Sequence, residues 1–306
     1  MGLFGRAVVL GVCCLPSVFS AIQSLEWNVT YTNANPDGQF ERRVIGVNGK
    51  WPPPAIELDY GDDLVLKVNN QLGDVVTGLH THGLFQNTTN YYDGPVGVVQ
   101  WYRFPFLISK LRKSGIAPGE SLTYNFTVQQ NGTYWIHSHL MGQYPDGLRS
   151  PFIIHNPNEP YTYDEEIIIT MSDWYHKEMP EGIQDFMNVE NPTGAEPIPQ
   201  AALFNDGQNG TINFQPGKTY RLRFINMAAF AMFHVWIEDH EMRVIEVDGV
   251  YTEEYTVPGI DLTTAQRVSV LVTAKNTTDQ NYAMVGAMDT DMFDTVPANL
   301  NPSMSS

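Results

Sequence analysis

Two histidine pairs, His80-Thr81-His82-Gly83 and His137-Ser138-His139, determine which fold this chain can adopt. Successive side chains of a β-strand point to opposite faces, so a His-x-His pair on a strand aims both imidazoles in one direction. Two such strands can bring four ring nitrogens to one point. The pattern therefore predicts a β-fold that carries a metal site. Imidazole binds copper, zinc, iron and nickel, so the ligand type alone leaves the metal open.

Length, composition and net charge limit the classes of protein to which this chain can belong. The chain has 306 residues, of which 12% are aromatic, with 25 Gly and 20 Pro. This length allows one large domain or two ordinary domains with real cores. The formal net charge of -17 argues against nucleic acid or an anionic membrane as a partner, because both carry the same sign of charge. A plain requirement for solubility also produces an acidic surface.

Residues 1–21 have the composition of a secretory signal peptide. Arg6 precedes an apolar run at 7–15 that is too short to span a membrane, and Ser20-Ala21 offers a small-residue cleavage site. The two cysteines, Cys13-Cys14, lie inside this segment, so no disulfide is expected in the mature chain. We therefore expect passage through the secretory pathway and an extracellular or cell-surface location.

The distribution of glycosylation sequons agrees with export. Six Asn-x-Ser/Thr sequons begin at Asn28, Asn87, Asn125, Asn131, Asn209 and Asn276. Each sequon is weak on its own, because such triplets arise by chance. Together with the signal peptide they predict a secreted glycoprotein.

Short apolar or alternating runs bounded by Gly, Pro, Asn and Asp recur along the rest of the chain, and helical periodicity is limited to a turn near 181–186. The predicted strands are 27–32, 64–69, 122–128, 133–137, 151–155, 165–172, 219–226, 233–238, 243–247 and 267–273. Regular short strands are typical of β-sandwiches and barrels. A polar, proline-marked segment at 156–160 divides them, so we predict an all-β chain with domains at 22–157 and 158–306.

Five segments in a fixed order carry a family resemblance. They are HTHGLFQ at 80–86, DGP at 93–95, IAPGE at 116–120, GTYWIHSH at 132–139, and Gln143 with Asp-Gly at 146–147. Together they resemble the first cupredoxin domain of the multicopper oxidases. The resemblance implies two tandem cupredoxin-like Greek-key β-sandwich domains.

Two further segments resemble a narrower group within this family. NPTGAEPIPQ at 191–200 and WIEDHE at 236–241 resemble the second domain of the fungal iron-transport multicopper oxidases. These are cell-surface ferroxidases that work beside an iron permease. The resemblance therefore implies Fe(II) and O2 as substrates and an iron permease as a possible partner.

The family uses copper as its cofactor, held partly by His-x-His motifs. By position, His80 resembles a ligand of the type 2 copper, and His82, His137 and His139 resemble ligands of the type 3 pair. These four histidines correspond to half of the trinuclear cluster of the family. The chain has no His-Cys-His motif, so the type 1 site is expected to be absent from it and the C-terminal domain of the family to be missing.

The same resemblance suggests an Fe(II) site built from hard oxygen ligands. Glu196 and Asp294 match the positions of the family's iron-binding carboxylates. Carboxylates favour Fe(III) over Fe(II), which makes the bound iron easier to oxidise. Asp289, Glu238 and Asp239 are weaker candidates along the iron route, for which a solvated surface role is the simpler interpretation.

The segment 101–114 departs from the family pattern. It carries Arg103, Lys110, Arg112 and Lys113 without an acidic residue, and it stands where relatives have a short connection with a disulfide cysteine. Its composition suggests intron sequence retained in the reading frame, and the alternative is a basic surface loop. Absence of the family's disulfide would remove about 2 to 5 kcal/mol of stability.

These observations lead to two surviving hypotheses. The first is a secreted multicopper oxidase of the ferroxidase type, which oxidises Fe(II) to Fe(III) and reduces O2 to water for iron uptake. Under this hypothesis the 306 residues are an N-terminal part that is inactive alone. The second is a copper-binding or structural secreted module without turnover. The preferred reductant stays open, because a laccase-like oxidation of phenols fits the same copper ligands.

Overall fold

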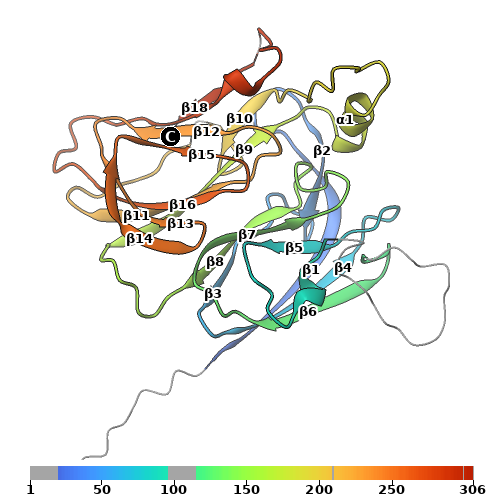
Figure 1. Cartoon of the computed structure of the whole chain (residues 1–306), viewed down its shortest axis with the longest axis horizontal. Helices are drawn as coiled ribbons and strands as arrows, with labels where there is room; N and C mark the ends of the chain where they lie inside the picture. The colour runs from blue at the N-terminus through green and yellow to red at the C-terminus, as the bar shows by residue number, and fades with distance from the viewer. Residues whose placement is uncertain (1–19, 96–114, 209, 299, 306) are drawn as a thin grey trace, which may run out of the picture.

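A computed structural model describes residues 20–95, 115–208, 210–298 and 300–305. Figure 1 shows two β-rich units, the first coloured blue to green and the second yellow to red. The predicted signal peptide up to residue 19 and the predicted insertion at 101–114 lie outside the described residues, so both stay predictions. No helix within the described ranges has the length and apolar character needed to cross a membrane.

The first unit contains two four-stranded sheets. Its strands are β1 (Ile22–Ala34), β2 (Arg42–Val47), β3 (Ile56–Asp59), β4 (Asp63–Asn70), β5 (Leu79–His82), β6 (Ser121–Thr127), β7 (Gly132–Ser138) and β8 (Arg149–His155), with the 3-10 turn η1 (Asn90–Tyr92). One sheet has the order β2-β1-β4-β6 and the other β3-β8-β7-β5. The two histidine pairs lie in the second sheet, on the adjacent strands β5 and β7.

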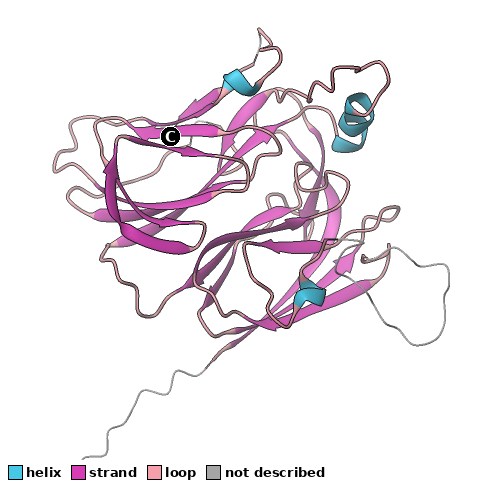
Figure 2. Ribbon diagram, in the orientation of Figure 1, coloured by secondary structure: helices cyan, strands magenta, loops and turns pink. Residues whose placement is uncertain are grey.

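The second unit also has two sheets. Its elements are β9 (Glu165–Trp174), α1 (Met179–Phe186), β10 (Ala201–Phe204), β11 (Thr219–Asn226), β12 (Phe233–Ile237), β13 (Met242–Val247), β14 (Val250–Val257), β15 (Gly259–Leu262), β16 (Arg267–Thr273), β17 (Met284–Met288), η2 (Thr290–Met292) and β18 (Ser303–Ser305). The sheet orders are β10-β9-β11-β16-β13-β14 and β15-β12-β17-β18. The helix α1 confirms the turn expected near 181–186. Figure 2 shows how strongly strands predominate over helix.

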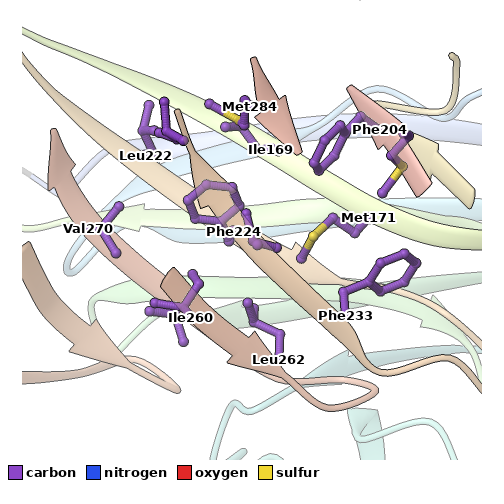
Figure 3. Packing of buried hydrophobic residues seen from close by; sticks show 14 of the residues in the cluster. Ile169, Met171, Phe204, Leu222, Phe224, Phe233, Ile260, Leu262, Val270 and Met284 are labelled. Carbon is purple, nitrogen blue, oxygen red and sulfur yellow. The ribbon is translucent and has the colours of Figure 1, made fainter. Parts of the chain in front are cut away.

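Alternation of apolar and polar side chains produces the sandwich cores. Along β4, Leu64, Leu66 and Val68 are fully buried, and the residues between them reach the surface. They pack against residues of the opposite sheet such as Phe152 and Ile154 on β8. The second core is built in the same way, and Figure 3 shows its apolar side chains interdigitating between strands. The predicted all-β fold class is confirmed.

Both faces of β7 are covered. All seven of its residues are buried. One face contributes to the core of the first unit, and Trp135 on the other face packs against Ile225 and Met227 of the second unit. Figure 1 shows β7 at the centre of the molecule, where it contacts β11 and β16. The strand that carries His137 is therefore held by both units.

A buried network of charged side chains also joins the units. Glu246 on β13 is fully buried and accepts a hydrogen bond of 2.6 Å from the backbone N–H of Thr133 on β7. The same carboxylate pairs with Arg221 and accepts from the Ser269 hydroxyl. Each β-ladder among the described strands stays within 22–155 or within 165–305, so side chains rather than shared sheets connect the two units.

Candidate metal centre

The four predicted histidines converge on one end of the β5 and β7 pair. These strands are antiparallel neighbours, with His80 directly opposite His137 and His82 opposite Trp135. Ring centroids of His80 lie 5.5 Å from His82, 5.3 Å from His137 and 5.5 Å from His139. The structure therefore brings all four predicted ligands to one place.

Three of the rings approach closely enough to share a metal. One ring nitrogen from each of His80, His82 and His137 lies within 4.8 Å of the other two. Nδ1 of His82 faces Nε2 of His137 at 3.3 Å. The fourth histidine, His139, is exposed, and its ring centroid lies 5.9 Å from that of His137. It lies next to this group of three nitrogens and is not part of it.

Carbonyl acceptors fix the tautomers of two rings. Nδ1 of His80 lies 2.6 Å from the backbone oxygen of Asp93, and Nδ1 of His137 lies 2.9 Å from the backbone oxygen of Ser138. A carbonyl oxygen can only accept, so each Nδ1 carries the proton and each Nε2 keeps its lone pair. Outer partners of this kind orient metal-binding histidines in known sites.

The Asp93 turn reaches His80 because Gly94 allows a very close approach. Gly94 has φ of +93°, and a Cβ atom there would lie 2.0 Å from the backbone oxygen of Leu79. Only glycine fits this position without a shift of the backbone. The Asp93 carboxylate adds a second contact, with Oδ1 3.2 Å from Nδ1 of His80. The sequence contained the signal for this partner, because Asp93-Gly94 belongs to one of the motifs that carry the resemblance, but no sequence pattern linked it to His80.

Burial keeps the rings of His80, His82 and His137 neutral. Loss of solvent lowers the pKa of His82 to about 4, and the positive charge of Arg267 adds to this effect. Burial also lowers the pKa of His80, which the Asp93 oxygens oppose, and it moves the pKa of His137 well below its usual range. Neutral imidazole is the form that binds metal. The donor set, the free Nε2 atoms and the neutral state all fit copper.

Aromatic rings form one wall of the site. Trp135 stacks on His137 with ring centroids 4.0 Å apart and on His82 at 5.1 Å, both at 23° between planes. Tyr144 lies edge-on to His137 at 5.2 Å. These contacts hold the imidazoles in position and exclude water from one side of the site. We had not predicted the packing role of Trp135 and Tyr144, because the sequence does not show which face of β7 the second unit covers.

The predicted Fe(II) carboxylates lie away from the histidines. Glu196 is exposed in the loop between α1 and β10, and Asp294 is exposed just after η2. Ala201, five residues after Glu196, and Asn301, seven residues after Asp294, form a parallel bridge. Among the described residues, neither carboxylate belongs to a compact group of metal-binding side chains. Their role in binding iron stays a prediction.

The three weaker acidic candidates have local structural contacts. Asp289 caps η2 by accepting a hydrogen bond of 3.0 Å from the Asp291 N–H. Glu238 accepts from the N–H of Ala283 at 3.3 Å, and Asp239 has φ of +54° in the turn after β12. These contacts agree with the simpler interpretation given to them above.

A second group of side chains within the described ranges could hold a metal ion. Nε2 of His155 lies 3.1 Å from Glu57, and Nδ1 lies 3.3 Å from Glu166. Each ring nitrogen faces a different carboxylate, so the imidazole bridges the two acids. This group joins the last strand of the first unit to the first strand of the second.

Comparison with known proteins agrees with the geometry. A family model described as multicopper oxidase matches residues 165–302, and a second one with the same description matches residues 28–106 and 107–159. The iron transport multicopper oxidase fetC of Epichloe festucae is 54% identical over 90% of this chain and 43% of its own length. The iron transport multicopper oxidase fio1 of Schizosaccharomyces pombe is 50% identical over 100% of this chain and 48% of its own. The chain therefore spans about half the length of the curated relatives it matches.

Solved structures share the fold. The crystal structure of Fet3p, a multicopper oxidase that functions in iron import, superposes with a TM-score of 0.86 and 42% identity, covering 93% of this chain and 52% of that one. The laccase from Botrytis aclada superposes with a TM-score of 0.80 and 31% identity, covering 94% of this chain and 52% of that one. The family models cover most of the chain. This chain belongs to the multicopper oxidase family.

Proposed function

We propose that this chain is part of a ferroxidase that oxidises Fe(II) to Fe(III) and couples this to the reduction of O2 to water for iron uptake. The observation that carries the proposal is the convergence of His80, His82 and His137 with their ligand nitrogens within 4.8 Å. The iron-transport names of fetC and fio1 support iron as the reductant.

The four histidines at 80, 82, 137 and 139 are the proposed copper ligands. Copper bound there supplies one-electron redox chemistry toward dioxygen. The protein's own contribution is to keep the rings of His80, His82 and His137 neutral and to leave Nε2 of His80 and His137 unprotonated. The carbonyl oxygens of Asp93 and Ser138 hold the two Nδ1 protons, and Trp135 keeps one side of the site dry.

Glu196 and Asp294 are the proposed ligands of the substrate Fe(II). Both carboxylates are exposed and can therefore meet iron from solution. Hard anionic oxygen stabilises Fe(III) relative to Fe(II), which lowers the potential at which the iron gives up its electron. The net charge of -17 also raises the local concentration of cations.

We further propose that these 306 residues bind copper without appreciable turnover when they are alone. The resemblance assigns only half of the histidines of the trinuclear cluster to this chain. If the protein is exported, as residues 1–21 and the sequons suggest, it acts at the cell surface or outside the cell, where an iron permease is the expected partner for Fe(III).

A laccase-like oxidation of phenols is the second candidate. The likeness to the Botrytis aclada laccase favours it, because the same two-unit fold serves a laccase there. A catalytically inactive copper-binding module is a third possibility. Iron and phenol oxidation differ in their need for the two carboxylates, because a neutral phenol gains little from an anionic ligand.

Two experiments test the proposal. In the first, Glu196→Gln and Asp294→Asn are made in the full-length protein that contains this chain. We expect each variant to raise the KM for Fe(II) about tenfold or more and to leave the oxidation of a phenol unchanged. Equal effects on both reductants, or no effect on Fe(II), would refute iron as the substrate of this site.

The second experiment uses the 306 residues alone, expressed with copper. We expect bound copper, no blue absorption of a copper-thiolate site, and no Fe(II)-dependent oxygen uptake. Strong colour together with turnover would contradict the proposed need for residues outside this chain. Failure to retain copper would instead refute the ligand role of the four histidines.

A further inference from the structure

The Asn191 side chain makes hydrogen bonds within the loop that carries Glu196. Its side-chain Nδ2 donates to the backbone oxygens of Phe186, at the end of α1, and of Ala195, both at 3.0 Å. Its Oδ1 accepts from the N–H of Ala195 at 3.2 Å. One amide group therefore holds both backbone polar groups of the residue directly before Glu196.

Packing alone does not hold this loop. A cavity of about 280 Å³ lies beneath it, lined by side chains that include Phe186, Asn191, Ala195 and Pro197. Ile198, after Glu196, packs against the core of the second unit, whereas the residues before Glu196 line the cavity. On that side the hydrogen bonds of Asn191 hold the backbone next to Glu196.

The other end of the loop is also anchored. The Gln200 side chain accepts from the His176 N–H at 2.7 Å and donates to the Ile198 oxygen at 3.0 Å. The Gln200 N–H donates to the Trp174 oxygen at 2.8 Å, which joins the loop to β9. Glu196 lies between the two anchors, exposed, and accepts no hydrogen bond from any described residue.

We propose that Asn191 is a positioning residue that orients Glu196 for Fe(II), an inference that rests on the proposed ferroxidase function. The backbone before Glu196 is fixed by the amide, and the carboxylate itself is left free for a ligand. A carboxylate held in this way loses less conformational freedom when it binds iron than one on an unrestrained loop. Asn191 does not touch the substrate, and its effect passes entirely through Glu196.

The main test is Asn191→Asp in the full-length enzyme, loaded with copper. This change keeps the Oδ1 acceptor for Ala195 and removes both donated hydrogen bonds. We expect the KM for Fe(II) to rise about 10- to 100-fold, with an unchanged rate for a phenolic reductant and unchanged copper absorption. An unchanged KM for Fe(II) would overturn the proposal.

Asn188→Asp is the matched control. It adds the same charge in the same loop, and Asn188 uses only its Oδ1, which accepts from the Glu190 N–H at 3.1 Å and which Asp retains. We expect its KM for Fe(II) to stay near the wild-type value. An equal rise in both variants would show that added charge, rather than loop position, is responsible, and would also overturn the proposal.

Two further measurements separate this proposal from the proposed function. The double variant Asn191→Asp with Glu196→Gln should be no worse for Fe(II) than Glu196→Gln alone, because Asn191 acts only through Glu196. If Glu196→Gln itself leaves the KM for Fe(II) unchanged, the iron role of Glu196 fails. If Glu196→Gln raises that KM and Asn191→Asp does not, only the positioning role fails.

Hydrogen exchange supplies a readout that is independent of activity, and its measurement on the wild-type protein needs no variant to fold. In the wild-type protein the Ala195 N–H should exchange slowly for an amide in a surface loop, because Asn191 accepts its hydrogen bond. Asn191→Ala should remove this protection and leave the Gln200 N–H protected. Fast exchange of the Ala195 N–H in the wild-type protein would contradict the proposal.

Discussion

His80 and His137 are direct cross-strand partners in the antiparallel pair of β5 and β7, with ring centroids 5.3 Å apart and ring planes at 83°. Directly opposite residues of an antiparallel pair point to the same face. The backbone ladder therefore fixes their separation before any metal binds. The proposed copper site is therefore preorganised by strand register, and its affinity for metal should depend on the few groups that orient the rings.

The Asp93 carboxylate should contribute modestly to copper affinity. Asp93→Ala removes the Oδ1 contact of 3.2 Å to His80 and keeps the backbone oxygen that accepts the Nδ1 proton. We therefore expect a loss of about tenfold in copper affinity, the lower end of the range for outer partners of metal ligands. Copper titration against a competing chelator measures it. Asp279→Ala, at an exposed site, is the control and should retain wild-type affinity.

Gly94→Ala should have a larger effect than Asp93→Ala. The added Cβ would lie 2.0 Å from the Leu79 oxygen, so the turn must move away and take the backbone oxygen of Asp93 with it. Gly61→Ala is a matched control, because Gly61 has a similar φ of +96° and open space around its Cβ position. Chelator competition should show weaker copper binding only for Gly94→Ala. Equal losses in both variants would mean that backbone strain, not the clash, is the cause.

Glu246→Gln should destabilise the whole described fold. The carboxylate is fully buried between the two units, and its loss leaves the charge of Arg221 without its closest partner. Breaking such a buried pair costs about 3 to 5 kcal/mol in the free energy of unfolding. Glu254→Gln, which breaks only an exposed pair with Arg243, should cost less than about 1 kcal/mol. Denaturant titration of both variants checks this, and similar losses would rule out a special role for the buried network.

Asp146 should give the fold a measurable dependence on pH. Its Oδ1 lies 2.9 Å from Nη1 of Arg42, and both of its oxygens accept from the Met179 N–H. Burial raises the pKa of this carboxyl to about 6, although Arg42 and the Met179 N–H lower it. The folded state therefore binds this proton more tightly than the unfolded state does, whose pKa is about 3.9.

The sign of the pH effect follows from this difference. The stabilising contribution of the Asp146 proton is complete below the unfolded pKa and is lost as the pH rises through about 6. The free energy of unfolding of the wild-type protein minus that of Asp146→Asn should thus fall between about pH 4 and about pH 7. Thermal or denaturant unfolding at several pH values measures it. A difference that stays constant or increases over this range is the outcome that contradicts the prediction.

Strands with a clear apolar pattern or a histidine pair could be predicted from the sequence, and others, such as β2, β10, β14 and β18, could not. β4 is recognisable in the sequence by apolar residues at every second position, and β16 by closely spaced apolar residues. β10 has four residues and β18 has three, and they are strands only because β9 and β17 offer them a partner. Pairing of this kind depends on neighbours that are distant in sequence, so local patterns do not reveal it.

The candidate site, too, could be predicted from the sequence only in part. The spacing within each histidine pair fixes both rings on one face of a strand, because side chains alternate, and this made the four ligands recognisable. The partners of those ligands come from elsewhere. Asp93 reaches His80 through a turn that Gly94 brings against Leu79, and Trp135 becomes a wall of the site because the second unit covers β7.

The sequence by itself determined the β-fold, the family and the four candidate imidazole ligands, because each follows from residue type, from motifs and from spacing along a strand. The tertiary structure alone decided which ring nitrogens stay free, which rings lose their solvent, and how Asn191 holds the backbone before Glu196. The physical reason is that tautomer, burial and loop position depend on contacts between segments far apart in the chain. Those contacts exist only after the sheets have packed.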